Sequence, residues 1–277
     1  MKFAIGFAVM TMTCFPIFAQ GIDVVYPGYE RDDYTTKILS LALSYSEQNY
    51  QIKAYGSDLP KHQAFKKLAT NNGIDVMFGG STLEREALYR PVRFPLMKGL
   101  YGWRVSLVHK DNKQLFDDTN TLSDLQHYSA GQFNTWSDTK VLRANDITVA
   151  TSSDYSGLYT MLHKKRFDHF PRSIIEVTWN IQEFSHLDLV IEPNVLIHYP
   201  SAYYVYVRKD NEILAHEIYN GLIQAQQDGS FDTLFSQHFG AHVERVKSEK
   251  RQIIPLTNPY LSPLTPIHNS SMWLNFD

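Results

Sequence analysis

The sequence GGSTLER at residues 79–85 places side chains suited to binding a small anion directly after an apolar run at 74–78. Ser81 and Glu84 have the spacing of a capping box, which predicts that a helix begins here. The first turn of a helix presents unpaired backbone N–H groups, and these favour a bound anion. The guanidinium of Arg85 belongs to the same turn, and its fork of donors matches a carboxylate. We therefore expect Arg85 to anchor a ligand anion; an ion pair with a neighbouring glutamate is the alternative.

Two aromatic residues stand where predicted strands end. Tyr26 closes an apolar run at 22–26, and Trp136 follows another run at 128–133. In open α/β sheets ligands bind beyond the carboxyl ends of the strands, so either ring could wall or cover a ligand. Packing in the core is the alternative for Tyr26, and packing beneath the following helix is the alternative for Trp136.

The chain shows no constellation of catalytic residues. It contains no Gly-x-Ser-x-Gly elbow, no His-Glu-x-x-His sequence and no phosphate-binding loop. His238 and His242 are four positions apart, but Gly240 between them ends the predicted helix that would align them for a metal. We therefore expect a protein that is not an enzyme and that uses no cofactor and no metal.

Alternating strand and helix patterns position these residues. In the first half, apolar runs predict strands at 22–26, 51–55 and 74–78. Apolar residues three or four positions apart predict the helices between them, which start with Asp32 or Asp33 near the cap and after Pro60. This alternation predicts a parallel sheet with helices on its faces.

A second alternation begins after Lys110. Its helices are predicted to run to about Asn145, from near Asp154, from Glu212 to Gly229, and from Ser230 to a close at Phe239-Gly240. Its predicted strands are 128–133, 147–151, 166–172, 187–191, 195–199 and 202–207.

Short features along the chain form one pattern. Thr82 and Arg85 form a Thr-x-x-Arg turn after a strand, Phe94-Pro95 follows it, and the helices end with Gly229, Leu234 and Phe239-Gly240. This pattern resembles the polar-amino-acid family of periplasmic solute-binding proteins, family 3, over nearly the whole chain from residue 20 to Gly240. The resemblance implies an α/β protein with the two-lobed, periplasmic-binding-protein-like type II fold, in which two strands cross between the lobes at a hinge.

The resemblance also implies how the chain is divided. Lobe 1 would comprise residues 20–105 and 207–277, and lobe 2 would comprise residues 106–206. The C-terminal tail at 241–277 is punctuated by prolines and too irregular for another domain. We expect the tail to wrap lobe 1, anchored by its aromatic residues.

The family's ligand contacts can be carried over to four positions. By resemblance, Thr82 and Arg85 would bind the ligand's carboxylate, and Tyr26 would form an aromatic wall. The start of the helix after Trp136 matches a place where the family binds a ligand carboxylate through backbone N–H and hydroxyl groups.

Arg172 departs from the family pattern. Where amino-acid binders have an aspartate that holds the ligand's ammonium group, this chain has Pro-Arg-Ser. Arg85 and Arg172 would then face one cleft, which predicts a ligand with a second anionic group or with a masked amine. The alternative is that Arg172 pairs with Glu176 or Asp168 and does not reach the ligand.

Residues 1–19 have the layout of a signal peptide. Lys2 is followed by an apolar stretch and by a cleavage site before Gln20. Cys14, the only cysteine, lies in this segment, so the mature chain would have no disulfide. An uncleaved membrane anchor is the alternative. We expect export to the periplasm.

These observations predict a periplasmic solute-binding protein. It would capture a small anionic or zwitterionic, amino-acid-like solute between its lobes and deliver it, as a monomer, to an ABC permease of the inner membrane. The mild net charge of −3 gives no basic face for nucleic acid. A component that reports the solute to a signalling receptor is one alternative, and a periplasmic enzyme on the same fold is another.

Overall fold

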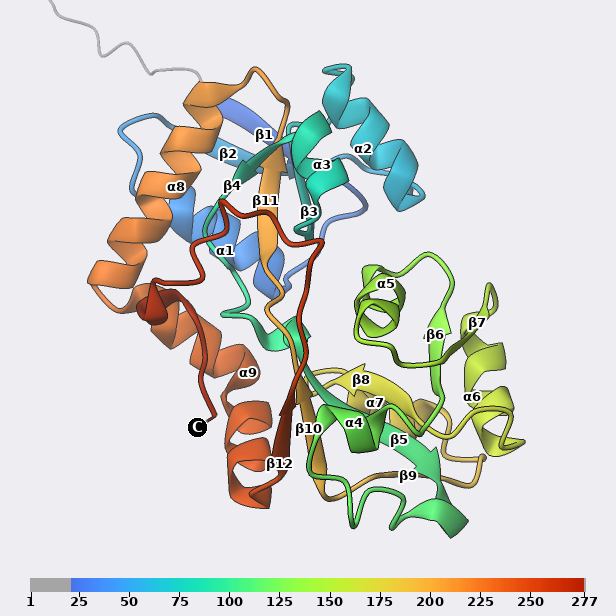
Figure 1. Ribbon diagram of the computed structural model, residues 1–277. Coiled ribbons are helices and arrows are strands. Elements are labelled where there is room, and N and C mark those ends of the chain that lie inside the picture. Colours follow the sequence, from blue (N-terminus) through green and yellow to red (C-terminus); the bar gives the residue numbers. More distant parts are fainter. Residues whose placement is uncertain (1–20, 277) are drawn as a thin grey trace, which may run out of the picture.

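The part of the chain that this computed structural model describes, residues 21–276, folds into two lobes joined at a hinge (Figure 1). Lobe 1 contains the strands near the N-terminus, and lobe 2 contains the strands of the middle of the chain. The predicted signal peptide lies outside the described residues. Within residues 21–276, no helix is long and apolar enough to span a membrane.

Lobe 1 combines a parallel strand pair with a three-stranded antiparallel sheet in the order β3-β11-β4. The parallel pair is β1 with β2, and Asp75 N donates to Val25 O at 2.9 Å to connect β1 to the segment before β3. Its strands are β1 (Ile22–Tyr26), β2 (Tyr50–Ala54), β3 (Val76–Gly80), β4 (Arg90–Val92) and β11 (Tyr203–Val207). Its helices are α1 (Tyr34–Leu43), α2 (Lys61–Ala69), α3 (Leu83–Leu88) and α8 (Glu212–Gln227).

Helices α1 and α8 show how the sequence shapes this lobe. Asp33, one of the two aspartates expected near this cap, caps α1 by accepting from the backbone N–H of Thr36 at 2.9 Å. The helix then buries Ala42 against α8. A Cβ on Gly221 of α8 would lie 1.8 Å from the carbonyl oxygen of Ala42, so only glycine permits this close approach of the two helices.

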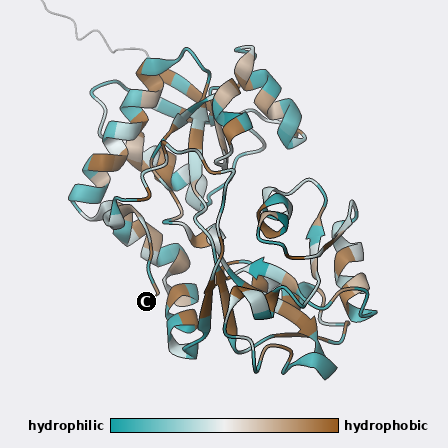
Figure 2. Ribbon diagram, in the orientation of Figure 1, coloured by the Kyte–Doolittle hydropathy of each residue, from teal (hydrophilic) through white to brown (hydrophobic). Residues whose placement is uncertain are grey.

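Lobe 2 is built on a mixed sheet in which the order is β12-β10-β5-β8, where β12 is Gln252–Pro255, and β9 also pairs with β5. All seven residues of β5 are buried, and Figure 2 shows hydrophobic residues concentrated in the strands of this sheet. The elements are β5 (Trp103–His109), α4 (Leu122–Leu125), β6 (Ala130–Phe133), α5 (Ser137–Ala144), β7 (Val149–Ser152), α6 (Tyr155–His163), β8 (Phe170–Ser173), α7 (Val177–Glu183), β9 (Leu189–Ile191) and β10 (Val195–His198). The parallel pair β6 and β7 forms a separate small sheet.

Two of the chain crossings between the lobes run side by side at the hinge. Leu96 N donates to Tyr203 O at 3.0 Å, and Tyr199 N donates to Gly102 O at 3.1 Å, so the crossings run side by side. A Cβ on Gly102 would lie 1.9 Å from Tyr199 O. Glycine is therefore required where the outgoing and returning segments touch.

The C-terminal part of the chain differs from the expectation. Helix α9 (Ser230–Glu249) does not close at Gly240; it continues because Val243 and Val246 bury an apolar face with helical spacing. Strand β12 (Gln252–Pro255) then pairs in parallel with β10 of lobe 2.

After β12 the tail returns to lobe 1. Leu83 N of α3 donates to Tyr260 O at 3.3 Å. Trp273 then packs near Gly99 and donates to Pro266 O at 2.9 Å. The tail, expected on lobe 1 alone, thus contacts both lobes (Figure 1).

Candidate ligand-binding site

A cavity of about 310 Å³ lies between the two lobes at the hinge. Residues of both lobes and of both hinge crossings line it, so relative movement of the lobes would open or close it. Lobe 1 contributes Lys61 and Gly80, the crossings contribute Tyr101, Ser201 and Tyr203, and lobe 2 contributes Arg104, Trp136, Ser137, Asp138, Arg172 and Glu176.

Arg172 lies on the lobe 2 wall of this cavity and is held in a fixed orientation. It is in β8, only 4% exposed, and its Nε donates to Asn180 Oδ1 at 2.8 Å. Its Nη2 lies 3.0 Å from Glu176 Oε2, and its guanidinium carbon lies 4.8 Å from the centre of the Trp136 ring. Arg172 therefore pairs with Glu176, one of the two partners weighed from the sequence, and lines the cavity as well.

Glu176 takes a different position from the one that its spacing indicates. Ser173 and Glu176 have the spacing of a capping box, but Ser173 Oγ donates to Leu100 O at 3.2 Å instead. Helix α7 begins at Val177, three residues later than a cap at Ser173 would start it, and Glu176 is its N-cap residue. The Glu176 side chain makes no capping bond and pairs with Arg172 instead.

A second arginine lines the same wall. Arg104 of β5 lies 2.5 Å from Asp138 Oδ1, and the Tyr199 hydroxyl donates to the same oxygen. Burial acts most strongly and lowers the pKa of Arg104, but the interactions with Asp138, Tyr199 and Glu176 together outweigh it and hold this pKa above its ordinary value. Arg104 Nε is buried without a hydrogen-bond partner among the described residues. A buried donor without a partner marks a place where a ligand oxygen would be stabilised.

Helix α5 points its first turn at the cavity. Trp136 stands at the N-cap and makes no side-chain capping bond, while Ser137 and Asp138 line the cavity. The first backbone N–H groups of a helix have no partner within the helix, and the helix dipole favours negative charge there. This turn, Arg104 and Arg172 together form a wall suited to an anionic group.

Lobe 1 contributes a single charged side chain to the cavity, Lys61, the first residue of α2. Partial dehydration between the cleft walls, together with the charge of Arg85, lowers the pKa of Lys61 to about 8. Lys61 takes part in no ion pair within the described residues.

Arg85 and Thr82 lie beside the cavity rather than on its wall. Thr82 caps α3 by accepting from Arg85 N at 3.1 Å, whereas the sequence indicated Ser81 as the cap. Arg85 Nη1 donates to Gly80 O, and the guanidinium lies over the Phe65 ring at 5.1 Å. Arg85 therefore holds the end of β3, whose last residue lines the cavity.

Tyr26 is part of the lobe 1 core. It is 3% exposed, and the guanidinium carbon of Arg31 lies 4.7 Å from the centre of its ring. It lines a different cavity, between α1 and β2. Of the five residues named from the sequence, the structure brings Trp136 and Arg172 together in the interlobe cavity and places Tyr26, Thr82 and Arg85 outside it.

Two residues that line the cavity were not among the candidates from the sequence: Arg104 was weighed there as a structural or hinge contact, and Lys61 was not considered. Arg104 had a usable signal, because a charged residue inside a strand of buried apolar residues needs a partner or a function. The sequence contains no comparable signal for Lys61, since a lysine at the start of a surface helix is common. Its role depends on where α2 lies relative to lobe 2.

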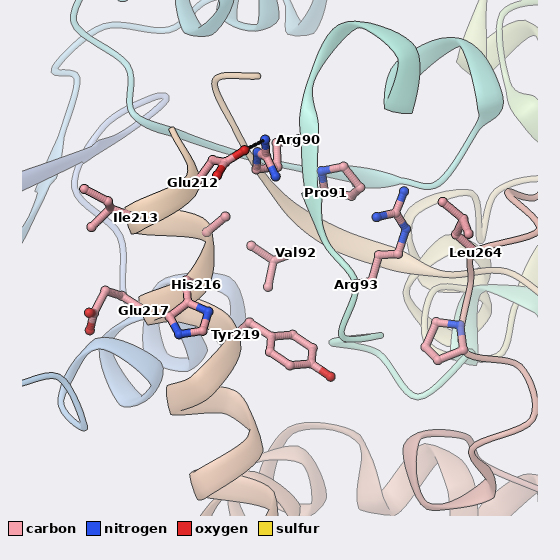
Figure 3. A pocket seen from close by; sticks show the side chains of 12 residues that line it. Arg90, Pro91, Val92, Arg93, Glu212, Ile213, His216, Glu217, Tyr219 and Leu264 are labelled. Carbon is pink, nitrogen blue, oxygen red and sulfur yellow. Dashed lines mark hydrogen bonds and ion pairs between the residues drawn. The ribbon is translucent and has the colours of Figure 1, made fainter. Parts of the chain in front are cut away.

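A larger cavity, about 700 Å³, lies on the outer face of lobe 1 between β4, α8 and the tail (Figure 3). Its charged residues include Arg90 and Glu212, which already form an ion pair at 2.5 Å. Ile213 and Leu264 on its rim are 74% and 66% exposed. No residue of lobe 2 lines this groove, so movement of the lobes cannot enclose a solute there.

Within the described part of the chain, one group of side chains has the composition of a metal site. The donor atoms of His109, His163 and Asp188 lie within 4.8 Å of one another. Asp188 Oδ1 forms an ion pair with Lys110 Nζ at 2.7 Å. Nδ1 of each histidine accepts a hydrogen bond from a backbone N–H at 3.2 Å. Because His109 follows Arg104 by five strand positions, the group lies about 16 Å from the cavity wall and plays no part in the site.

Known proteins are similar to this chain in structure. No protein-family model and no curated protein matches the sequence. A probable extracellular-binding protein of an amino-acid ABC transporter from Bacillus subtilis, YtmK, superposes with a TM-score of 0.58 at 15% identity, over 80% of this chain and 99% of that one. An arginine-specific periplasmic binding protein from Salmonella typhimurium gives a TM-score of 0.55 at 15% identity, over 78% and 99%.

A structure from a study of glutathione import in Streptococcus mutans gives a TM-score of 0.55 at 16% identity, over 80% of this chain and 96% of that one. At such identities the likeness establishes the fold. It confirms the two-lobed architecture that the sequence resemblance predicts. This chain has the two-lobed α/β fold of amino-acid ABC transporter substrate-binding proteins.

Proposed function

We propose that this protein is an exported solute-binding protein that captures a small anionic or zwitterionic, amino-acid-like solute between its lobes. The observation that carries the proposal is the interlobe cavity, where Lys61 faces the wall formed by Arg104, Arg172 and Trp136. Among the described residues that line the cavity, no nucleophilic side chain is hydrogen-bonded to a base, and this favours binding over catalysis.

The solute acts by closing the lobes. An anionic group of the solute accepts from the first turn of α5 and from the arginines of lobe 2, while the rest contacts lobe 1. Contacts made to both lobes exist only in the closed form, so the solute shifts the population toward closure. A difference in affinity of about 5.5 kcal/mol between the two forms would turn a 1:99 equilibrium into 99:1.

The partner of the closed form is an ABC permease of the inner membrane. Amino-acid ABC transporters are named among the structural neighbours, and this supports transport as the use of the captured solute. The signal peptide predicted at residues 1–19 would deliver the protein to the periplasm, where it acts as a monomer. Removal of this segment from exported protein, seen as an N-terminus at or near Gln20 by mass spectrometry, tests the location.

A thermal-shift screen tests solute capture. Amino acids, dicarboxylates and small peptides are added to the purified protein, and a solute at 100 times its Kd raises stability by about 2.7 kcal/mol. The same screen on Arg172→Gln separates capture in the cleft from binding elsewhere. A shift that is lost in this variant supports the proposal, and the absence of any shift over the whole screen contradicts it.

A further inference from the structure

The charged groups on the two sides of the interlobe cavity differ in how they are paired. On lobe 2 both carboxylates that line it are occupied, Asp138 by Arg104 and Glu176 by Arg172. On lobe 1 the ammonium of Lys61 has no carboxylate within ion-pair distance in the described part of the chain. The lining therefore carries three cationic side chains and two carboxylates, and the unbalanced charge is on lobe 1.

This arrangement disfavours a solute ammonium group. Such a group would have to displace an arginine from Asp138 or Glu176, or lie unpaired near guanidinium groups in a partly dehydrated cavity. Both are costly, because charges removed from water need a partner. A second anionic group, by contrast, would find Lys61 available without breaking an existing pair.

We propose that the solute carries two anionic groups, one held by Arg104 and Arg172 of lobe 2 and the other by Lys61 of lobe 1. This inference rests on the function proposed above and identifies the solute class as small dianions, such as dicarboxylates or acidic amino acids with a blocked amine. A solute with two anionic ends bridges the lobes through charge at both ends. Closure is then tied to the charge of the solute as well as to its shape.

Two acidic side chains line the neighbouring lobe 1 cavity that Lys61 also lines: Asp33, which pairs with Arg31 at 2.8 Å, and Asp58. Asp58 is exposed, and it does not line the cavity that contains the two arginines. It forms no ion pair among the residues described. Asp58 is therefore a control site: a solute ammonium bound on lobe 1 would depend on it, and a solute carboxylate would not.

Three probes of equal chain length test the solute class by calorimetry. Glutarate carries two negative charges, 5-aminopentanoate carries one of each sign, and 1,5-diaminopentane carries two positive charges. We expect glutarate to bind at least about tenfold more tightly than 5-aminopentanoate, since a hydrogen bond to a charged group is worth this factor or more. The diamine should show no binding.

Variants locate the second anionic group. Lys61→Gln should lower glutarate affinity about tenfold or more, whereas Lys66→Gln, which removes an exposed charge from the same helix, and Asp58→Asn should leave it unchanged. Lys61 belongs to none of the hydrophobic core clusters, so its substitution leaves the core intact.

The inference is overturned if glutarate fails to bind at millimolar concentration, if 5-aminopentanoate or the diamine binds as tightly, or if Lys61→Gln binds glutarate normally. In each case a solute found by the thermal-shift screen would leave the proposed function standing, because that screen does not depend on the charge of the solute. Loss of binding in Asp58→Asn alone would identify a zwitterionic solute instead.

Discussion

The guanidinium of Arg172 lies against the face of Trp136, with 4.8 Å between the guanidinium carbon and the ring centre. Phe170 and Tyr155 add further ring contacts at 5.1 and 5.6 Å. Such stacking suits arginine better than lysine, because the planar guanidinium keeps its donors at the edge while its face covers a ring. The donors of Arg172 are thereby held at the cavity wall.

Two substitutions of Arg172 should therefore distinguish the contribution of its positive charge to solute affinity from the contribution of its planar, stacked guanidinium. Arg172→Lys keeps the positive charge but loses the fork and the stacking, and we expect the affinity for the solute found by screening to fall about tenfold. Arg172→Gln should cost about 2–5 kcal/mol of binding free energy, much of it because Glu176 is left without its partner. Calorimetry checks both values.

Arg143→Gln serves as the matched control, because Arg143 is exposed on α5 and lines no part of the interlobe cavity. Circular dichroism establishes that each variant is folded. Affinity that stays within twofold of the parent in Arg172→Gln would remove Arg172 from the site.

The affinity for an anionic solute should depend on pH through Lys61. The pKa of Lys61 is lowered to about 8 by partial dehydration and by the neighbouring Arg85. The group is protonated at pH 7 and loses its charge as the pH rises through this value. Affinity for glutarate should thus be flat below about pH 7 and fall above pH 8, approaching tenfold per pH unit.

Lys61→Gln should bind glutarate weakly and with no such decline. Titrations at pH 6.5, 7.5, 8.5 and 9.5 compare the two proteins. A parental profile that stays flat to pH 9.5, or a decline that persists in Lys61→Gln, would assign the pH dependence to another group.

Much of the fold can be predicted from the sequence, namely those helices and strands whose position is determined by local sequence patterns. Asp33 starts α1, and the apolar spacing of 212–227 matches α8. The two-lobed fold follows from the order of such elements together with the family resemblance. The length of helix α9 was harder to predict from the sequence. Gly240 has a low helix propensity, so an end of the helix was expected there. The helix continues to Glu249 because Val243 and Val246 are buried against the rest of the molecule.

The candidate site could be predicted only in part. Trp136 follows from its position after a strand and Arg172 from its departure from the family pattern, and both line the cavity. Arg85 also follows a strand, but the direction of its side chain is set by Phe65 and Gly80, which no local pattern reveals. Lys61 meets lobe 2 only through the relative placement of the lobes.

The hinge should tolerate no side chain at Gly102. A Cβ there would lie 1.9 Å from Tyr199 O, so Gly102→Ala must force the two crossings apart. We expect a loss of about 2–4 kcal/mol in the free energy of unfolding, measured by urea denaturation.

Gly240→Ala is the contrasting substitution. Gly240 lies inside α9, and the nearest atom to an added Cβ is 3.9 Å away. Alanine should stabilise the helix by about 0.5–1 kcal/mol. If Gly102→Ala and Gly240→Ala changed the free energy of unfolding equally, the close contact with Tyr199 at the hinge would not explain why residue 102 is glycine.

The tail should contribute to the stability of the whole fold. Trp273 contacts Gly99 at the hinge, and Phe276 packs against Trp103 at 4.6 Å between ring centres. Trp273→Ala should lower the free energy of unfolding by about 2 kcal/mol, less than for a fully buried tryptophan because the ring is partly exposed.

Leu264→Ala provides the comparison in the same tail. Leu264 is 66% exposed, and its truncation should change stability by less than about 0.5 kcal/mol. Equal midpoints of urea denaturation for Trp273→Ala and the parent would show that the tail does not stabilise the lobes.

A crystal structure of the protein with the solute found by screening tests the central claim most directly. The account predicts electron density for the solute between the lobes, with one anionic group at Arg104 and Arg172 and another at Lys61, and with the lobes closed around it. Density in the groove between β4 and α8, or lobes that remain apart around an empty cleft, would contradict it.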